Sequence, residues 1–140
     1  MNRADCQKLA QERIADVKAL LAAKRWALAY YVAGYAVECA LKACVLVRVA
    51  GETEVIFSEK RFSERCWTHN LEQLFDCAGL KAAFEADLAA DPLLKENWVI
   101  VREWSESSRY DPATKDEAVD LYNGITDKRH GVLTWVKRFW

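Results

Sequence analysis

The chain has 140 residues, a formal net charge of −1 at pH 7 and a hydrophobic fraction of 52%. That length suits one domain with a substantial core, so we expect a single domain over residues 1–140. The nearly neutral charge excludes a molecule that attracts nucleic acid or acidic membrane with its whole surface, so any anion binding requires a local patch.

The N-terminal segment predicts an amphipathic helix near residues 4–23, with apolar side chains at Ala10, Ile14, Val17 and Leu21. The start of the chain lacks the apolar core of a secretory signal, so we expect a cytoplasmic protein.

The five cysteines are odd in number and form no C-x-x-C pair. We therefore expect reduced thiols that are mostly buried.

Residues 26–48 form a long apolar run without proline, which predicts a buried central helix, antiparallel to the first. Within this run, helical spacing places four polar side chains on one face: Tyr31, Tyr35, Glu38 and Lys42. The stripe is either a satisfied polar seam inside a helical core or a binding site. Two charges near the middle of the run argue against a membrane-spanning helix.

Residues 51–68 predict a long, partly ordered loop after a helix end at Gly51. The loop carries Lys60, Arg61 and Arg65, offset by two glutamates. This balance favours a solvated loop over a nucleic-acid patch.

Two short helices are expected next, the first capped by Thr68 with His69 in its first turn. Cys66 precedes His69 in a C-x-x-H pattern, but no second pair accompanies it, so we expect no metal site. Asp91-Pro92 then predicts the start of a third main helix that continues to about residue 105.

The last helix has a clear start signal, the capping box from Thr114 to Glu117. Its apolar stripe runs to the end of the chain and is interrupted by a polar turn at Asp127–His130. Gly124 and Gly131 within it suggest close helix contact. We therefore expect an all-α fold, an antiparallel four-helix up-and-down bundle with short extra helices between the second and last main helices.

Four segments of the chain form a recognisable set: AYYVAGYAVECALKA (29–43), THNLEQLF (68–75), WSESSRY (104–110) and HGVLTWVKRFW (130–140). Together they resemble the HEPN domain, named for higher eukaryotes and prokaryotes nucleotide-binding, over nearly the whole chain. The resemblance implies an all-helical, HEPN-like bundle that commonly forms dimers. It also implies either association with a minimal nucleotidyltransferase or the activity of an RNA-cleaving toxin or effector.

The ribonuclease branch of that family carries an Arg-x4-6-His motif, in which arginine would stabilise phosphate charge and histidine would move a proton. This chain lacks it. Arg65 precedes His69 with only three residues between them, and Arg129 adjoins His130. We therefore expect no catalytic residues.

The resemblance suggests ligand-binding roles for seven residues: Tyr31, Tyr35, Glu38, Lys42, His69, Arg109 and Tyr110. Some of them would stabilise the bundle instead of touching a ligand. Aromatic rings beside Lys42 and Arg109 could stack a base and hold a phosphate. The basic end of the last helix could add phosphate contacts from Lys128, Arg129, His130, Lys137 and Arg138. No cofactor is expected.

The leading interpretation is a non-catalytic HEPN module, in a toxin–antitoxin-like or defence context, that binds a nucleotide, RNA or a nucleotidyltransferase partner. It would be a homodimer with no membrane contact, and its interface would use Trp135, Phe139 and Trp140. A second interpretation is a metal-independent ribonuclease with a divergent site, using Arg65 with His69 or Arg109 with His130. The third is a structural or regulatory subunit of a larger complex.

Overall fold

The structure, a computed structural model, describes residues 1–51 and 62–140, and every regular element in this part of the chain is helical. The elements are α1 (Arg3–Ala22), α2 (Trp26–Gly51), α4 (Phe62–Cys66), α5 (Leu71–Cys77), α6 (Lys81–Ala90), α7 (Pro92–Arg102), the 3-10 helix η1 (Glu106–Tyr110), α8 (Lys115–Thr126) and α9 (Val132–Val136). The expected all-α fold class is confirmed. None of the described helices is both long enough and apolar enough to cross a membrane.

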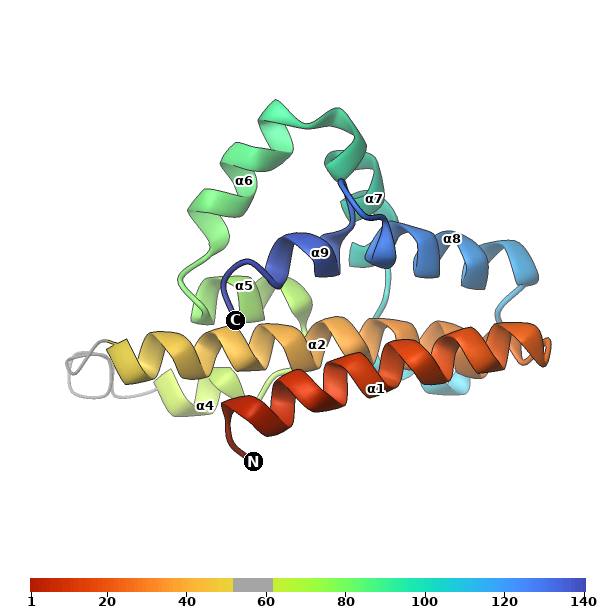
Figure 1. Ribbon diagram of the computed structural model, residues 1–140, viewed down its shortest axis with the longest axis horizontal. Helices are drawn as coiled ribbons and strands as arrows, with labels where there is room; N and C mark the ends of the chain where they lie inside the picture. Colours follow the sequence, from red (N-terminus) through yellow and green to blue (C-terminus); the bar gives the residue numbers. More distant parts are fainter. Residues whose placement is uncertain (52–61) are drawn as a thin grey trace.

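α1 and α2 form the predicted antiparallel hairpin and run side by side along the long axis of the molecule (Figure 1). α1 begins with a capping box, in which the side chains of Asn2 and Asp5 each accept the other's backbone N–H. It ends in a Schellman turn, because Lys24 has a φ of 58° and the N–H of Arg25 donates to the carbonyl of Leu20 at 2.9 Å. This turn places Lys24 and Arg25 directly before the first residue of α2.

α2 is the central element, as its apolar sequence predicts. It contacts α1, α5, α8, α9 and η1. In Figure 1, α5, α8 and α9 lie above α2, and α1 follows its lower edge. The buried residues of α2 between Ala29 and Val45 are mostly alanine, valine and cysteine, so neighbouring helices can approach its backbone closely.

α6 and α7 form an arm that stands away from the α1–α2 hairpin (Figure 1). The junction is the one that Asp91-Pro92 predicts: the Asp91 side chain accepts hydrogen bonds from the N–H groups of Leu93 and Leu94, both at 3.1 Å. α7 buries Leu94 and Trp98 and packs against α6, α8 and α9. The arm is therefore joined to the rest of the molecule mainly through α8 and α9.

The expected loop at residues 51–68 needs correction. Its second part forms helix α4, which packs against α5 and buries Phe62. The Arg48 guanidinium lies over the Phe62 ring, 5.5 Å from its centroid. Lys60 and Arg61 belong to residues 52–61, which lie outside the described part of the chain.

The expected cap of α5 also needs correction, because Asn70 caps the helix and Thr68 does not. The Asn70 side chain accepts a hydrogen bond from the N–H of Gln73 at 2.9 Å, and Thr68 Oγ1 accepts from the N–H of Asn70 at 3.0 Å. Asparagine is at least as good an N-cap as threonine, so the later residue starts the helix. His69 consequently precedes α5 instead of lying in its first turn.

The expected last helix is broken into α8 and α9. The Asp127 carboxylate accepts hydrogen bonds from the N–H groups of Arg129 and His130, at 2.9 and 2.7 Å, and so competes with helical hydrogen bonding. Gly131 follows at the N-cap of α9, where a Cβ would lie 2.5 Å from the carbonyl oxygen of Asp127. A Cβ at Gly124 would stand 3.5 Å from α7, an ordinary contact, so this glycine does not mark an unusually close approach.

Candidate functional site

Glu38 lies at the centre of the polar stripe on α2 and is only 1% exposed. Its Oε1 accepts a hydrogen bond from Lys42 Nζ at 2.7 Å and lies 2.9 Å from His69 Nδ1. Its Oε2 is buried without a hydrogen-bond partner among the described residues. The Glu38–Lys42 pair expected from the sequence is therefore present, and His69 ties the segment before α5 to the same carboxylate.

His69 extends this network toward η1. Its Nε2 lies 3.5 Å from Glu106 Oε2, and Glu106 Oε1 pairs with Arg109 at 3.1 Å. The Arg109 guanidinium lies over the ring of Tyr110, 4.7 Å from its centroid. Tyr110 is 76% exposed. The network thus leads from the buried Glu38 to an arginine–tyrosine pair at the surface.

The two tyrosines of the stripe belong to an aromatic cluster beside this network. The rings of Tyr31 and Tyr35 are nearly parallel, with centroids 6.4 Å apart and 8° between their planes. Trp104 stacks on Tyr31 with centroids 6.2 Å apart, and its indole N–H donates to the carbonyl of Tyr31 at 3.1 Å. Gly34 permits this approach, because a Cβ there would lie 2.2 Å from the indole ring. Burial raises the pKa of Tyr35 to about 12, so its hydroxyl stays protonated at neutral pH.

A pocket of about 600 Å³ lies at the N-terminal end of α2, and we term it the α2 groove. It is lined by Lys24, Arg25, Trp26, Ala27, Leu28, Tyr31, Arg109, Pro112 and Ala113. These described residues include three cations and two aromatic rings but no carboxylate. Neither Lys24 nor Arg25 forms an ion pair with any other residue that the structure describes. The start of α2 adds the positive end of its helix dipole.

The structure brings the seven candidate residues into one region, but only Tyr31 and Arg109 line the α2 groove. Lys24, Arg25 and Trp26 also line it and are absent from the residues predicted above. Their signal in the sequence is a pair of cations followed by tryptophan at a turn between helices. No sequence pattern shows that η1 lies beside the turn between α1 and α2, because that placement depends on tertiary packing.

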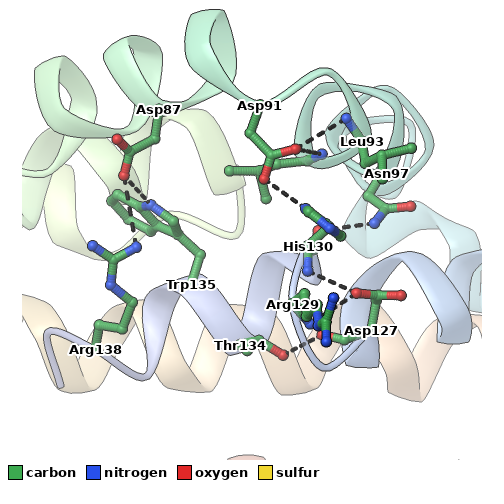
Figure 2. A network of polar contacts seen from close by, with 11 residues as sticks. Asp87, Asp91, Leu93, Asn97, Asp127, Arg129, His130, Thr134, Trp135 and Arg138 are labelled. Carbon is green, nitrogen blue, oxygen red and sulfur yellow. Dashed lines mark hydrogen bonds and ion pairs between the residues drawn. The ribbon is translucent and has the colours of Figure 1, made fainter.

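A second polar cluster surrounds His130 at the turn between α8 and α9 (Figure 2). His130 Nδ1 lies 2.7 Å from Asp91 Oδ2, and the His130 carbonyl accepts from Asn97 Nδ2 at 2.8 Å. These contacts fasten the α8–α9 turn to the α6–α7 turn. The hydrogen bond with His130 lowers the pKa of Asp91, and backbone N–H groups of His130 and Arg129 lower the pKa of Asp127.

Trp135 was expected to be exposed at a dimer interface but is only 4% exposed. Its indole N–H donates to Asp87 Oδ2 at 2.7 Å, and its ring packs against Phe84 and Phe139 with centroids 4.8 and 4.5 Å away. Trp135 therefore belongs to the core of this chain and is not free to form an interface. Arg138, from the basic end of the chain, lies over the Trp135 and Phe139 rings and 3.7 Å from Asp87.

The two arginine–histidine pairs considered for a ribonuclease have other contacts. Arg65 pairs with Asp76, and His69 lies between two carboxylates. Arg109 lines the α2 groove, whereas His130 belongs to the cluster at the α8–α9 turn. The described contacts therefore assemble neither pair into one site.

The cysteines are free thiols, as expected: Cys6, Cys39, Cys44 and Cys77 are buried, and Cys66 is partly exposed. Burial raises the pKa of Cys39 to about 11 and that of Cys44 to about 12, so both are protonated at neutral pH. Within residues 1–51 and 62–140, no group of three or more histidine, cysteine or acidic side chains could hold a metal ion.

Comparison of the chain with protein-family models, curated proteins and solved structures gives no significant match.

Proposed function

We propose that the chain is a HEPN-like module that binds single-stranded RNA or a nucleotide in the α2 groove without cleaving it. The observation that carries this proposal is the groove itself, which combines cations and aromatic rings without a carboxylate among its described lining residues. Cations suit phosphate groups, and a flat ring suits a stacked base. The resemblance of four segments to HEPN domains supports the same ligand class.

The groove has the size and rigidity that a nucleotide site requires. Its volume of about 600 Å³ lies within the range of roughly 300–1,000 Å³ that small-molecule sites occupy. Arg25 lies at the start of α2 and Arg109 on η1, so cations enter from two elements. Tyr31 is held by ring contacts with Tyr35 and Trp104, and less side-chain freedom is lost when a base stacks on it.

Binding is proposed in place of cleavage because no histidine lines the groove. Both ring nitrogens of His69 already face carboxylates, Glu38 at 2.9 Å and Glu106 at 3.5 Å. The Arg-x4-6-His motif is also missing. The groove therefore offers phosphate and base contacts but no group placed to move a proton.

The binding test uses a fluorescently labelled oligoadenylate and anisotropy at about 0.1 M salt. Arg25→Glu is expected to weaken binding roughly tenfold, because it exchanges a phosphate-binding cation for a carboxylate. Lys8→Glu makes the same change of charge near the start of α1, about 20 Å of helix before its end at Ala22. It is expected to leave affinity within about twofold, since the Debye length is about 10 Å at 0.1 M salt. Equal weakening by both variants would contradict binding in the α2 groove.

The salt dependence of binding distinguishes a lost phosphate contact from a damaged fold. For single strands, the logarithm of the binding constant falls with the logarithm of salt concentration by about 0.7 for each neutralised phosphate. Arg25→Glu is therefore expected to make this slope shallower by about 0.7. An unchanged slope would show that Arg25 touches no phosphate. Calorimetry with ATP and GTP then shows whether one nucleotide suffices.

One observation favours a second candidate, a metal-independent ribonuclease with a divergent site. Asp91 holds His130 Nδ1 at 2.7 Å, and His130 Nε2 has no partner among the described residues. A base held by an orienting carboxylate has this arrangement. A denaturing gel of the same RNA decides between the candidates. Intact RNA is expected, whereas cleavage that disappears in His130→Ala would establish the ribonuclease.

The resemblance supports three further parts of the proposal: a four-helix HEPN-like arrangement of α1, α2, α7 and α8, a homodimer, and a cytoplasmic minimal nucleotidyltransferase partner in a toxin–antitoxin-like or defence context. Packing of α1 and α8 on α2, and of α7 on α8, is compatible with such a bundle. The partner is tested by co-expression with a nucleotidyltransferase encoded beside this chain. We expect a complex that survives size-exclusion chromatography. Without such a complex and without RNA or nucleotide binding, a structural subunit of another assembly becomes the better interpretation.

A further inference from the structure

We propose a second binding site, separate from the α2 groove, for a small aromatic molecule that carries one anionic group. The site is a pocket of about 350 Å³ between α5, α6 and α7, which we term the α6–α7 pocket. Its lining combines three aromatic side chains, Phe75, Phe84 and Trp98, with the cations Lys81 and Lys95. Its volume suits a small molecule.

The three aromatic side chains form a fixed apolar surface. Phe75 and Phe84 stack with centroids 4.2 Å apart and 6° between their planes. Trp98 meets these rings edge-on, at 5.4 and 5.2 Å. Each of the three residues is at most 7% exposed. A flat ring that enters the pocket therefore meets aromatic side chains whose positions are already set, which favours binding.

Trp98, which lines the pocket, also has an unused hydrogen-bond donor. The indole N–H groups of Trp104 and Trp135 donate to protein acceptors, but that of Trp98 has no partner among residues 1–51 and 62–140. It is not one of the buried unpaired polar atoms of this part of the chain, so solvent can reach it. A mostly buried tryptophan usually satisfies its N–H, and an acceptor on a ligand could do so here.

The charges of the α6–α7 pocket favour an anion. Arg102 and Glu72 approach within 3.7 Å and offset each other. The other charged lining residues are two cations, Lys81 and Lys95, and one acid, Glu85. None of these three forms an ion pair with another residue in the described part of the chain. Two cations against one acid leave one positive charge in excess, which an anionic group on the ligand would balance.

The test uses naphthoate and its uncharged analogue naphthalenemethanol with isotope-labelled full chain in solution NMR. The six tryptophans give separate indole N–H signals, and that of Trp98 is identified by its loss in Trp98→Phe. Naphthoate is expected to shift the Trp98 signal and to leave that of Trp104 in place. The uncharged analogue is expected to bind at least about threefold more weakly, because it lacks the charge that Lys81 and Lys95 attract.

Two variants test the pocket directly. Val99 lines the pocket and is 51% exposed, so Val99→Trp is expected to block entry and weaken naphthoate binding roughly tenfold. Lys95→Glu is expected to weaken it roughly fivefold. Ile100→Trp adds the same bulk at a neighbouring exposed position outside the lining, and Lys8→Glu repeats the charge change on α1. Both control variants are expected to keep wild-type affinity.

Four results overturn the proposal. They are a shift of another indole in place of that of Trp98, no shift at about one millimolar naphthoate, equal affinity for the uncharged analogue, and unchanged affinity in Val99→Trp. The α2 groove lies on other elements, so RNA binding by Val99→Trp is expected to match wild type whether or not this pocket binds its ligand.

Discussion

Glu38 keeps a carboxylate in the helical core, and one of its oxygens serves two neighbours. Lys42 comes from the same helix, whereas His69 comes from the segment before α5, so the carboxylate joins two parts of the chain. Since Glu38 is 1% exposed, these partners replace water for only one of its oxygens. This arrangement favours the polar seam over a binding site at Glu38, while Tyr31 from the same stripe lines the α2 groove.

Replacing Glu38 tests how much its contacts with Lys42 and His69 contribute to stability. Glu38→Ala is expected to lower the free energy of unfolding by about 2–4 kcal/mol, because it leaves a cavity and removes the partner of Lys42 and His69. Urea denaturation measures the change. Glu85→Ala removes a glutamate at an exposed position and is expected to cost less than about 0.5 kcal/mol. Similar losses in both variants would show that the contacts of Glu38 with Lys42 and His69 do not stabilise the fold.

The hydrogen bond between Asp91 and His130 predicts a dependence of stability on pH. The folded structure lowers the pKa of Asp91, chiefly through His130 and then through backbone N–H groups. The contribution of the Asp91 carboxylate to the free energy of unfolding is therefore complete above the unfolded pKa, about 3.9. It is lost as pH falls through the lower folded pKa. Asp91→Asn keeps an N-cap side chain but removes the charge.

Urea denaturation of wild type and Asp91→Asn at several pH values measures this dependence. Wild type is expected to be the more stable of the two near neutral pH, and the difference is expected to shrink below about pH 4. A difference that stays constant down to about pH 2 would mean that the charge of Asp91 does not contribute to stability.

Gly34 controls how closely α2 approaches the segment after α7. Alanine would normally favour the helix by up to about 1 kcal/mol. Here its Cβ would overlap the Trp104 ring, 2.2 Å away, so Gly34→Ala is expected to destabilise the protein by about 1–3 kcal/mol. Gly124→Ala is the matched control in α8, because its Cβ would meet only ordinary contacts, and it is expected to be neutral or stabilising. Thermal unfolding compares the two, and equal effects would contradict the role of Gly34.

At the level of elements, local signals in the sequence predicted the starts of α7 and α8, misplaced the start of α5 by two residues, and predicted helix continuity poorly. The caps at Asp91 and Thr114 were predicted because a cap depends on residues within one turn. The break after α8 was missed because the polar turn at Asp127–His130 was treated as an interruption within one helix, with the apolar stripe resuming at Val132. Asp127 binds two backbone N–H groups, and Gly131 fits where a Cβ would clash, but both facts require coordinates.

At the level of the whole molecule, the sequence predicted the all-helical class and the central place of α2 from the width of its apolar surface. It also predicted most of the polar stripe network on α2. The α2 groove could not be predicted, because it forms where the α1–α2 turn meets η1, far apart in the chain. The approach of Arg109 to Lys24 and Arg25 therefore depends on tertiary packing alone.

The oligomeric state is a prediction at the same scale. Light scattering is expected to give twice the chain mass of 16.0 kDa at high concentration. Trp135 is buried inside one chain, so the expected interface is left with Phe139 and Trp140, which are only partly buried. Trp140→Glu is expected to shift the equilibrium toward monomer, since a charge at an apolar interface lacks a partner. A monomer mass for wild type at every concentration would rule out the homodimer.

The contact of Trp104 with Tyr31 gives the α2 groove an intrinsic optical reporter. The two rings stack 6.2 Å apart, and Tyr31 lines the groove while Trp104 stands behind it. A ring that stacks on Tyr31 changes the polarity and the energy transfer that Trp104 experiences. Occupancy of the groove should therefore be visible as a change in emission of the unlabelled protein, with Trp26 in the lining and Trp104 behind Tyr31 both contributing. Trp104→Phe should reduce that change and leave the part that comes from Trp26.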